Sequence, residues 1–452
     1  MVYSIIQKSQ LEGARRLDAE YYQPEYLHLV NDLVRTHSYK SWNGIKGKFT
    51  TGPFGSEFNV ENYVTEGKYR YIRGKDVKEF IIADNDNVYI PEKDFERLKK
   101  YSLDEGDILI SVVGTLGNVA IVDKYSLPAI FSCKSTVFRT DSINPHYLIS
   151  YLNSKYGKNL LLRCMRGHIQ VGLNIDDLKY LLIFIPPKGK QEEIGRLFLK
   201  SQESLSESKR VYVRAEKLLL DELGLADFQF SEDLTFEVNF SDVKNFNRMD
   251  ADYFQPKYQL IVDKIIKKKR MLGIAKRIKN TVKPTPDIEY NYIEISNVNA
   301  GNGEVTFNRI LGKELPANAK IGLSGNELII SKVRPTRGAI AIIPQEFSDN
   351  FIASGAFSVF NVGYPMREYL QVVFRSVVGK LQLERPTTGT SYPTITDEDI
   401  ENTWVPDLSL DIQQKIADLV QQSYEARKKS KELLEEAKRK VEEMIEKGMK
   451  HS

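Results

Sequence analysis

The chain has 452 residues and a net charge of only +3, so any affinity for nucleic acid must come from local basic patches rather than from bulk charge. Its two cysteines exclude a disulfide scaffold and a cysteine-built zinc finger, and they suit the reducing cytosol, so we expect a cytoplasmic protein. The N-terminus lacks the apolar core of a signal peptide, and no apolar run approaches the roughly 18 residues that span a bilayer. We therefore expect no membrane partner.

One ordered set of segments occurs twice along the chain. The segment RLDAEYYQPEY at 16–26 corresponds to RMDADYFQPKY at 248–258. Three further matches follow in the same order: YIRGKDV at 71–77 with YIEISNV at 292–298, GDILISVVGTLGNVAIV at 106–122 with GNELIISKVRPTRGAIAII at 325–343, and IFIPPKGKQEEIGRLF at 183–198 with TWVPDLSLDIQQKIADLV at 403–420. A period of roughly 220 residues is far too long for a solenoid, so the sequence predicts two copies of one domain.

Each copy shows the same order of predicted elements. A short helix begins at a proline (Pro24, Pro256) and is followed by short β-branched and aromatic runs that read as strands. A helix near 145–161, answered by one near 366–383, precedes an apolar strand that ends in proline, and a long helix closes each copy. The pattern predicts an α+β fold of two similar globular domains and two long helices. The predicted bounds are 1–187 for the first domain, 188–224 for its long helix, 225–409 for the second domain and 410–452 for its long helix.

Apolar and small residues of both closing helices recur at steps of three and four, which is typical of a coiled-coil seam about four heptads long. Such a narrow seam needs a partner, and the two helices are the obvious partners for each other; two unrelated surface helices are the alternative. We expect Gly224 to end the first helix, and Asp411 with Gln414 to cap the second. The residues predicted to form the seam and partner interface are Ile194, Leu197, Leu205, Tyr212, Leu219, Ile416, Leu419, Leu433, Val441 and Met444.

Catalytic motifs fail on inspection. Gly167 and Gly172 have P-loop spacing, but Leu173-Asn174 stands where Lys-Ser/Thr must be. Pro406-Asp407 starts a nuclease-like pattern with no Glu-x-Lys behind it, and Ile185-Pro186-Pro187-Lys188 lacks the amide and the aromatic residue of adenine methyltransferases. We therefore expect no catalytic residue, no metal site and no cofactor, and we interpret the chain as a binding protein.

Basic and hydroxyl-bearing loops point to nucleic acid. Residues 264–283 hold nine Lys/Arg and no acid, a density that fits a phosphate backbone or, alternatively, a solvated helix face. Arg and Gln can bridge base edges, and Thr, Ser and glycine-flanked N–H groups suit phosphate oxygens. The residues predicted to bind are Thr51, Gly52, Phe54, Ser56, Arg73, Lys75, Thr115, Arg166, His168 and Gln170 in the first copy, and Lys267, Lys268, Lys269, Lys332, Arg334, Thr336, Arg337, Arg385, Thr387, Thr388, Ser391 and Tyr392 in the second.

The order GPFGS, YIRGKDV, GDILISVVGTLGNVAIV, RGHIQVGLN, IFIPP and QEEI resembles the target recognition domains in specificity subunits of type I restriction–modification enzymes. The second copy, with YIEISNV, ELIISKV, TGTSYPTI and QQKI, is similar. The resemblance implies that each recognition domain reads one half of a split site on double-stranded DNA, and that the long helices pair antiparallel as a spacer. It further implies that the helices dock two modification (methyltransferase) subunits, which bind the methyl donor, and through them restriction subunits.

The second copy departs from the pattern at one loop, where Arg334-Pro335-Thr336-Arg337 replaces the turn at residues 114–117. Two other readings remain open from the sequence. A self-contained DNA methyltransferase or nuclease would transfer methyl groups or cleave DNA as the purified chain alone. A coiled-coil adaptor that binds proteins only would show absent or salt-insensitive DNA binding.

Overall fold

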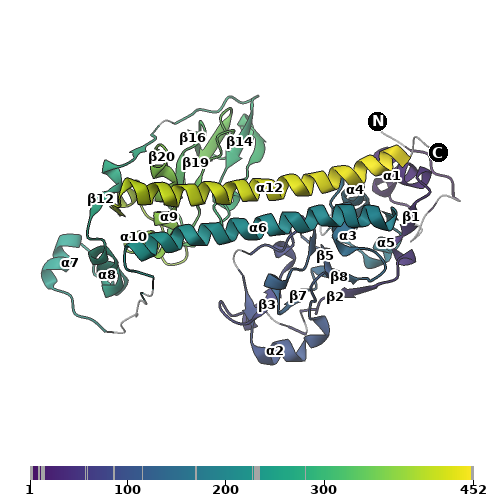
Figure 1. The fold of residues 1–452 in the computed structure, drawn as a ribbon, viewed down its shortest axis with the longest axis horizontal. Coiled ribbons are helices and arrows are strands. Elements are labelled where there is room, and N and C mark those ends of the chain that lie inside the picture. The colour runs from purple at the N-terminus through teal and green to yellow at the C-terminus, as the bar shows by residue number, and fades with distance from the viewer. Residues whose placement is uncertain are drawn as a thin grey trace. The chain divides into compact units, whose positions relative to one another are not determined.

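The computed structural model describes residues 4–8, 11, 16–55, 57–58, 60–84, 87–114, 116–167, 171–226, 228, 235–279 and 281–448. The chain forms two compact units, unit 1 from residues 1–205 and 428–452 and unit 2 from residues 206–427. Both divisions fall inside the long helices α6 (Lys188–Glu222) and α12 (Leu410–Gly448), so each unit holds part of each helix (Figure 1). The boundaries predicted from the sequence lie instead at the ends of these helices.

Two sheets form the β-structure of unit 1. One has the order β2-β8-β5-β6, and the other has the order β4-β3-β7, in which β3 and β7 run parallel. A further antiparallel pair joins β1 to β11. The strands are β1 (Tyr39–Ser41), β2 (Lys48–Thr51), β3 (Tyr69–Ile72), β4 (Tyr89–Ile90), β5 (Ile108–Ser111), β6 (Val119–Ile121), β7 (Ala129–Phe131), β8 (Ser135–Arg139), β9 (Met165–Arg166), β10 (Gly172–Leu173) and β11 (Leu182–Phe184).

Unit 2 repeats this arrangement. Its sheets have the orders β13-β20-β17-β18 and β15-β14-β19-β16, with β14 and β19 parallel, and β12 pairs with β21. Strand β16 is an addition beside β19. The strands are β12 (Lys268–Arg270), β13 (Lys276–Arg277), β14 (Glu289–Ile293), β15 (Asn308–Leu311), β16 (Ala319–Gly322), β17 (Leu328–Ser331), β18 (Ile340–Ile342), β19 (Phe351–Ser354), β20 (Phe357–Asn361) and β21 (Trp404–Pro406).

Most of the shorter helices follow the same repeat. They are α1 (Pro24–Arg35), α2 (Glu92–Arg97), α3 (Pro145–Leu152), α4 (Lys155–Arg163) and α5 (Ile175–Leu178) in unit 1, and α7 (Phe240–Phe246), α8 (Pro256–Lys264), α9 (Met366–Arg375), α10 (Val377–Glu384) and α11 (Asp397–Glu401) in unit 2. Helices α1, α3, α4 and α5 correspond to α8, α9, α10 and α11, whereas α2 and α7 have no counterpart among the described residues. Pro24 and Pro256 each occupy the first turn of a helix, as expected. The predicted mixed α and β fold with two long helices is confirmed.

The single helix predicted before the last strand of each copy is wrong in detail, because each copy has two helices there. The chain breaks at Ser154 in unit 1 and at Ser376 in unit 2. Immediately after each break, Gly157 or Gly379 packs against the preceding helix so closely that an added Cβ would lie 2.1 Å from Tyr151 O in the first case and 2.4 Å from Phe374 Cα in the second. Only glycine permits this turn, a constraint that helical periodicity does not reveal.

The long helices pair antiparallel within unit 1. Ser201 Oγ lies 3.0 Å from Ser430 Oγ, and Lys440 Nζ lies 2.7 Å from Glu193 Oε1, so residue numbers rise along α6 as they fall along α12. Unit 2 contains a matching serine pair between the two helices, in which Ser208 Oγ lies 3.0 Å from Ser423 Oγ. The four serines are buried. Small hydroxyl-bearing residues at these levels allow the two helix backbones to approach closely.

The seam of the helix pair differs from its predicted residues. Ile194, Leu219, Ile416 and Val441 are fully buried, whereas Leu197, Leu205, Tyr212, Leu419, Leu433 and Met444 are half-buried. Phe198, Val211, Val420 and Ile445 are buried in addition. The apolar face is wider than a two-helix seam because the helices also pack into the globular cores of both units.

The ends of the long helices test two expectations. Gly224 has a positive φ of +63° and lies just beyond α6, after Glu222 and Leu223, as predicted for a glycine that ends a helix. The predicted Asp411–Gln414 cap is wrong, because Ser409 caps α12 by accepting from Ile412 N at 3.4 Å, while Asp411 pairs with Lys415. No helix in the described ranges is long and apolar enough to cross a membrane.

Candidate nucleic-acid interface

Loops that follow successive strands of unit 1 converge on one edge. Gly52, after β2, approaches the Phe131–Ser132 backbone so closely that an added Cβ would lie 2.4 Å from Ser132 C. Gly74, after β3, would meet Lys134 Cβ at 2.8 Å and Val113 O at 3.4 Å. Val112 N donates to Lys134 O at 2.9 Å. Short loops pressed together in this way present their exposed side chains as one surface, which we call loop edge 1 (residues 51–55, 73–76, 112–114 and 132–135).

Charged and aromatic side chains occupy loop edge 1. Arg73 closes a turn on Asp76, with Nε 2.9 Å and Nη2 2.9 Å from its two carboxylate oxygens. Lys75 and Lys134 are exposed at adjacent turns, and the Phe54 ring is 63% exposed. Lys134 was not predicted from the sequence, because one lysine in a four-residue turn carries no motif. Its place between β7 and β8 brings it beside the predicted residues.

A β-hairpin leaves this edge. Strands β9 and β10 pair through Arg166 and Gly172, and Gly172 also bridges to Val113 of loop edge 1. Leu173 N donates to Val112 O at 2.9 Å. Gly167 has a φ of +97°, a conformation that favours glycine. This segment, residues 165–173, is called hairpin 1; its residues His168 and Gln170 lie outside the described residues, as do Ser56 and Thr115.

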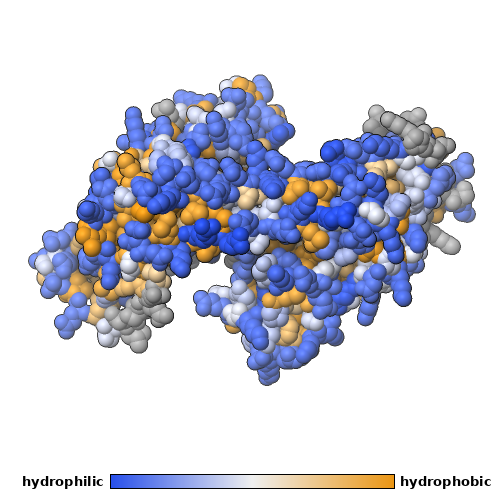
Figure 2. Space-filling view, in the orientation of Figure 1, coloured by the Kyte–Doolittle hydropathy of each residue, from blue (hydrophilic) through white to orange (hydrophobic). Residues whose placement is uncertain are grey.

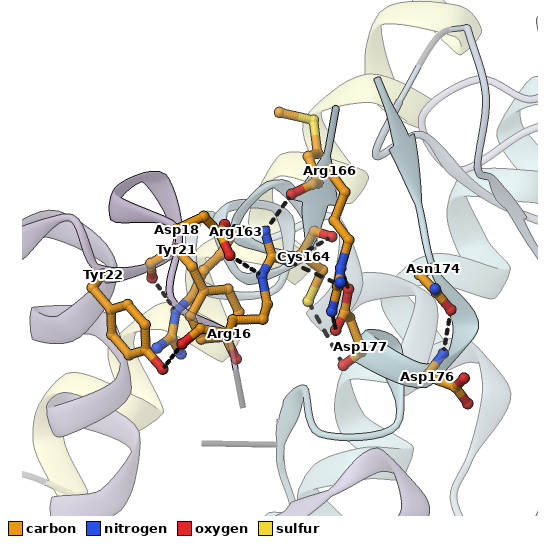
Figure 3. Close-up of polar contacts among 11 residues, drawn as sticks. Arg16, Asp18, Tyr21, Tyr22, Arg163, Cys164, Arg166, Asn174, Asp176 and Asp177 are labelled. Carbon is orange, nitrogen blue, oxygen red and sulfur yellow. Dashed lines mark hydrogen bonds and ion pairs between the residues drawn. The ribbon is translucent and has the colours of Figure 1, made fainter. Parts of the chain in front are cut away.

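Arg166, predicted to bind nucleic acid, is held at the base of hairpin 1 (Figure 3). Its Nε lies 2.5 Å and its Nη2 2.6 Å from the carboxylate oxygens of Asp177, whose side chain is only 2% exposed. The hydrogen bonds to Asp177 raise the pKa of Arg166 above its ordinary value. Burial raises the pKa of the neighbouring Cys164 thiol to about 12, so this cysteine stays protonated and unreactive.

Unit 2 builds the equivalent hairpin from residues 387–395, called hairpin 2. Thr388 and Thr394 exchange backbone hydrogen bonds of 3.0 and 2.9 Å, and Gly389 has a φ of +89°. Ile395 N donates to Lys332 O at 2.9 Å, as Leu173 N does to Val112 O in unit 1. The two hairpins therefore attach to their units through the same hydrogen bond.

Loop edge 2, which carries hairpin 2, comprises residues 294–297, 332–338 and 355–356. Arg334 N donates to Pro393 O at 2.7 Å, its Nη2 lies 2.9 Å from Ser391 O, and its guanidinium carbon lies 4.3 Å above the Tyr392 ring. A cation over an aromatic face is an attractive arrangement. Arg334 has a φ of +48° in place of the glycine of the first copy. The loop that departs from the pattern thus supports the tip of hairpin 2.

The remaining predicted residues of unit 2 divide by exposure. Lys332 is engaged inside the unit, since its Nζ lies 3.1 Å from Asp397 Oδ1, and Arg385 stacks on Tyr253 at 4.8 Å. The exposed members are Arg337, Thr388, Ser391 and Tyr392, with Thr336 and Thr387 half-buried. In unit 1, Thr51 is half-buried and Gly52 is buried.

The basic cluster at 264–283 is not a helix face. Lys268 to Arg270 form β12, which pairs with β21, and Lys269 Nζ lies 3.0 Å from Asp407. Lys268 Nζ donates to Val262 O at 2.8 Å. The Arg270 guanidinium stacks 3.6 Å above the Trp404 ring. Several of these cations therefore have partners in the fold, and Lys267 remains exposed beside them.

Residues 54–210 match the family described as "Type I restriction modification DNA specificity domain". This match covers most of the first copy and the first part of α6. The resemblance proposed from the sequence is confirmed by that match. No curated protein shows significant sequence similarity to the chain.

Solved structures with some similarity to the chain include two specificity subunits. The type I restriction-modification S subunit from M. genitalium is 15% identical, with 91% of this chain and 95% of that chain covered and a TM-score of 0.39. The HsdS subunit from Thermoanaerobacter tengcongensis is 14% identical, with 90% and 96% covered and a TM-score of 0.28. A chain from a study of complex assembly and conformational transition of the type I R-M system is 15% identical, with 91% and 97% covered and a TM-score of 0.29. The assignment rests on the family match.

Within the specificity domain, the match begins at Phe54 of loop edge 1 and includes hairpin 1 and the first part of α6. Both structural features described above thus belong to the family's region. The strands of unit 2 lie outside the matched residues, but they repeat the strand order and the hairpin attachment of unit 1. The described residues contain no group of three or more His, Cys, Asp or Glu side chains able to hold a metal ion.

Proposed function

We propose that the chain is a non-catalytic specificity subunit that reads a bipartite, asymmetric target on double-stranded DNA, one half-site with each copy. The observation that carries this proposal is the pair of hairpins. Hairpin 1 and hairpin 2 leave equivalent loop edges through the same backbone hydrogen bond, of 2.9 Å in both, yet they carry different tip residues. A constant support with a variable tip suits a domain that reads different sequences.

Base readout would come from exposed side chains of the hairpins and loop edges. Arginine can donate two hydrogen bonds to guanine, and Thr and Ser can bond to several bases or to phosphates. Arg337 and Tyr392 are exposed on unit 2, and Phe54 and Lys75 are exposed on unit 1. An exposed aromatic ring can also stack on a base or wedge between base steps.

The two half-sites should differ because the two copies differ where they would meet DNA. The turn after β3 carries Arg73 in unit 1, and the equivalent turn after β14 carries Glu294 in unit 2. Both turns close in the same manner, on Asp76 and Asn297 respectively. An arginine donates hydrogen bonds whereas a glutamate accepts them, so we expect the two copies to read different sequences.

Partner subunits would supply the chemistry. We propose that two modification subunits dock on the long helices and that restriction subunits join through them. Figure 2 shows a mostly hydrophilic surface on which apolar residues gather in the region of the long helices of unit 2. In this part of α6, the side chain of Val213 is 61% exposed. Exposed apolar side chains on a long helix suit a protein partner better than DNA.

Mapping of methylated bases tests the proposal. Cells that express the full chain with its modification subunit should methylate one asymmetric motif made of two short specific segments with a nonspecific gap. The modification subunit alone, and the chain alone, should leave that motif unmethylated. A continuous or symmetric motif would contradict the bipartite reading, and methyl transfer by the purified chain alone would show that it is an enzyme.

A further inference from the structure

An arginine–aspartate pair lies beside the base of each hairpin. In unit 1 the pair is Arg16 and Asp18, and in unit 2 it is Arg248 and Asp250. Each pair opens a segment that leads into the first helix of its copy. We call these segments strap 1 (residues 16–22) and strap 2 (residues 248–254).

Strap 1 holds the backbone of hairpin 1 (Figure 3). Arg16 Nη1 donates to Cys164 O at 3.2 Å, and Nη2 donates to Met165 O at 2.7 Å. Asp18 accepts from Arg16 Nε at 2.9 Å, and Asp177 accepts from Arg16 Nη1 at 3.3 Å. One guanidinium thus connects the strap, the end of α4, the start of the hairpin and the carboxylate that also binds Arg166.

Strap 2 repeats these contacts on hairpin 2. Arg248 Nη1 donates to Pro386 O at 3.3 Å, and Nη2 donates to Thr387 O at 3.1 Å. Asp250 accepts from Arg248 Nε and Nη2, both at 2.6 Å. The two carbonyls occupy the same places relative to hairpin 2 as Cys164 and Met165 occupy relative to hairpin 1.

A second contact in each copy fixes the strap from the other side. Arg163, at the end of α4, donates to Tyr21 O at 2.8 Å and stacks on the Tyr21 ring at 3.9 Å. Arg385, which follows α10, stacks on the Tyr253 ring at 4.8 Å. Each strap is therefore also held by an arginine near the end of the helix that precedes the hairpin.

Burial excludes a direct role for Arg16 in DNA contact. Its side chain is 3% exposed, and its guanidinium is already bonded to two carbonyls and two carboxylates. Burial opposes the charge of Arg16, but Asp18 and Asp177 outweigh it and keep its pKa above the ordinary value. A planar guanidinium is the one side chain that can donate to so many acceptors at once.

We propose that Arg16 and Arg248 are positioning residues that fix the two recognition hairpins, each acting on the half-site read by its own copy. This inference rests on the proposed function and adds residues to it. The hairpin carbonyls accept from the strap arginine, so loss of that arginine frees the base of the hairpin. A freed hairpin places its tip less accurately, and base discrimination falls before nonspecific affinity does.

The test uses the full chain together with its modification subunit and reads out methylated sequences. Arg16→Ala should make the half-site of the first copy degenerate, with a loss of discrimination of about tenfold or more, and leave the other half-site unchanged. Arg248→Ala should do the reverse. Arg16→Lys keeps the charge but cannot bridge the same acceptors, so it should behave as Arg16→Ala does.

Arg97→Ala is the matched control, because Arg97 also pairs with an aspartate of unit 1, Asp94 at 3.0 Å, but on the exposed surface of α2. It should leave both half-sites unchanged. A second measurement separates positioning from general loss of folding. The fold-loss of affinity for the mapped target in the double variant Arg248→Ala/Tyr392→Ala should be smaller than the product of the two single losses, by a factor of about three or more. In the double variant Arg16→Ala/Tyr392→Ala, the loss should equal the product of the two single losses.

The outcomes separate this inference from the function on which it rests. If the wild-type complex methylates a bipartite motif and both arginine variants leave it unchanged, the positioning role is overturned and the function stands. If Arg16→Ala abolishes methylation at all sites, the decision rests on Arg248→Ala and on the two double variants. General unfolding would give the same relation between double and single losses in both double variants, whereas positioning predicts a different relation in each. If the wild type shows no bipartite motif, the proposed function itself fails.

Discussion

Arg166 and Asp177 form a two-bond ion pair of 2.5 and 2.6 Å at the base of hairpin 1. The equivalent residues of unit 2 are Thr388 and Asp399, and Asp399 instead accepts from Thr396 N at 2.8 Å, within the cap of α11. The same position thus fastens a hairpin in one copy and a helix start in the other. The aspartate forms an ion pair with an arginine of the hairpin in the first copy, and it accepts from Thr396 in the second.

Asp177→Asn should therefore destabilise unit 1 and loosen hairpin 1. The substitution leaves Arg16 and Arg166 beside a neutral amide, and we expect a loss of about 1–3 kcal/mol in the free energy of unfolding, measured with denaturant. Asp176→Asn is the matched control, because Asp176 is exposed and pairs with Lys179 on the surface, so its loss should be about 0.5 kcal/mol or less. Equal effects of the two substitutions would contradict the role of Asp177.

The pair of Arg16 and Asp18 predicts a pH dependence. The hydrogen bond from Arg16 holds the pKa of Asp18 below its ordinary value of 3.8. A depressed pKa means that the ionised carboxylate stabilises the folded state above that value, and that the contribution disappears as pH falls through the lower folded pKa. The difference in unfolding free energy between wild type and Asp18→Asn should be constant from neutral pH to about pH 5 and shrink below about pH 4. A difference that grows on acidification would contradict this account.

The buried serine pairs between α6 and α12 should not tolerate replacement by large residues. Ser201 is fully buried and faces Ser430 across 3.0 Å. Ser201→Ala should cost about 1 kcal/mol through the lost hydrogen bond, and Ser201→Leu should cost more, about 1–3 kcal/mol, because the helices must separate to admit it. Thermal unfolding of the full chain measures both. A leucine variant more stable than wild type would show that the close approach at Ser201 is not required.

The basic strand β12 makes a prediction about salt. Each lysine that contacts a phosphate contributes about one unit to the slope of log affinity against log salt. Lys268 and Lys269 already have partners at Val262 and Asp407. Joint replacement of Lys267, Lys268 and Lys269 by Ala should therefore lower the slope by about one to two units and weaken binding to all sequences alike. An unchanged slope would show that this strand faces solvent only.

The sequence predicted the parts of the fold that repeat. The matched segments around YIRGKDV and YIEISNV lie on β3 and β14, which pair in parallel with β7 and β19 in the two units. The periodicity of α6 and α12 predicted two long helices, and Gly224 predicted the end of the first. Each of these signals is local in the chain, so one sequence was sufficient to detect it.

Long-range partners could not be predicted in the same way. Arg16 contacts the carbonyl of Cys164, and Lys269 contacts Asp407, in each case across more than a hundred positions. Charge density at 264–283 indicated a phosphate contact or a solvated helix, and nothing nearby revealed that β21 would turn the segment into a strand. Arg166 and Lys332 stood out as basic loop residues, but only the fold shows that Asp177 and Asp397 hold them.

Exchange of one recognition region tests the central claim most directly. Residues 40–185 of the full chain would be replaced by the corresponding residues of a related specificity subunit, and the bases methylated with the same modification subunit would be mapped for both chains. The account predicts that one half-site changes to a new sequence while the other half-site stays as in the wild type. A simultaneous change of both half-sites, or of neither, would contradict the claim that each copy reads its own half of the target.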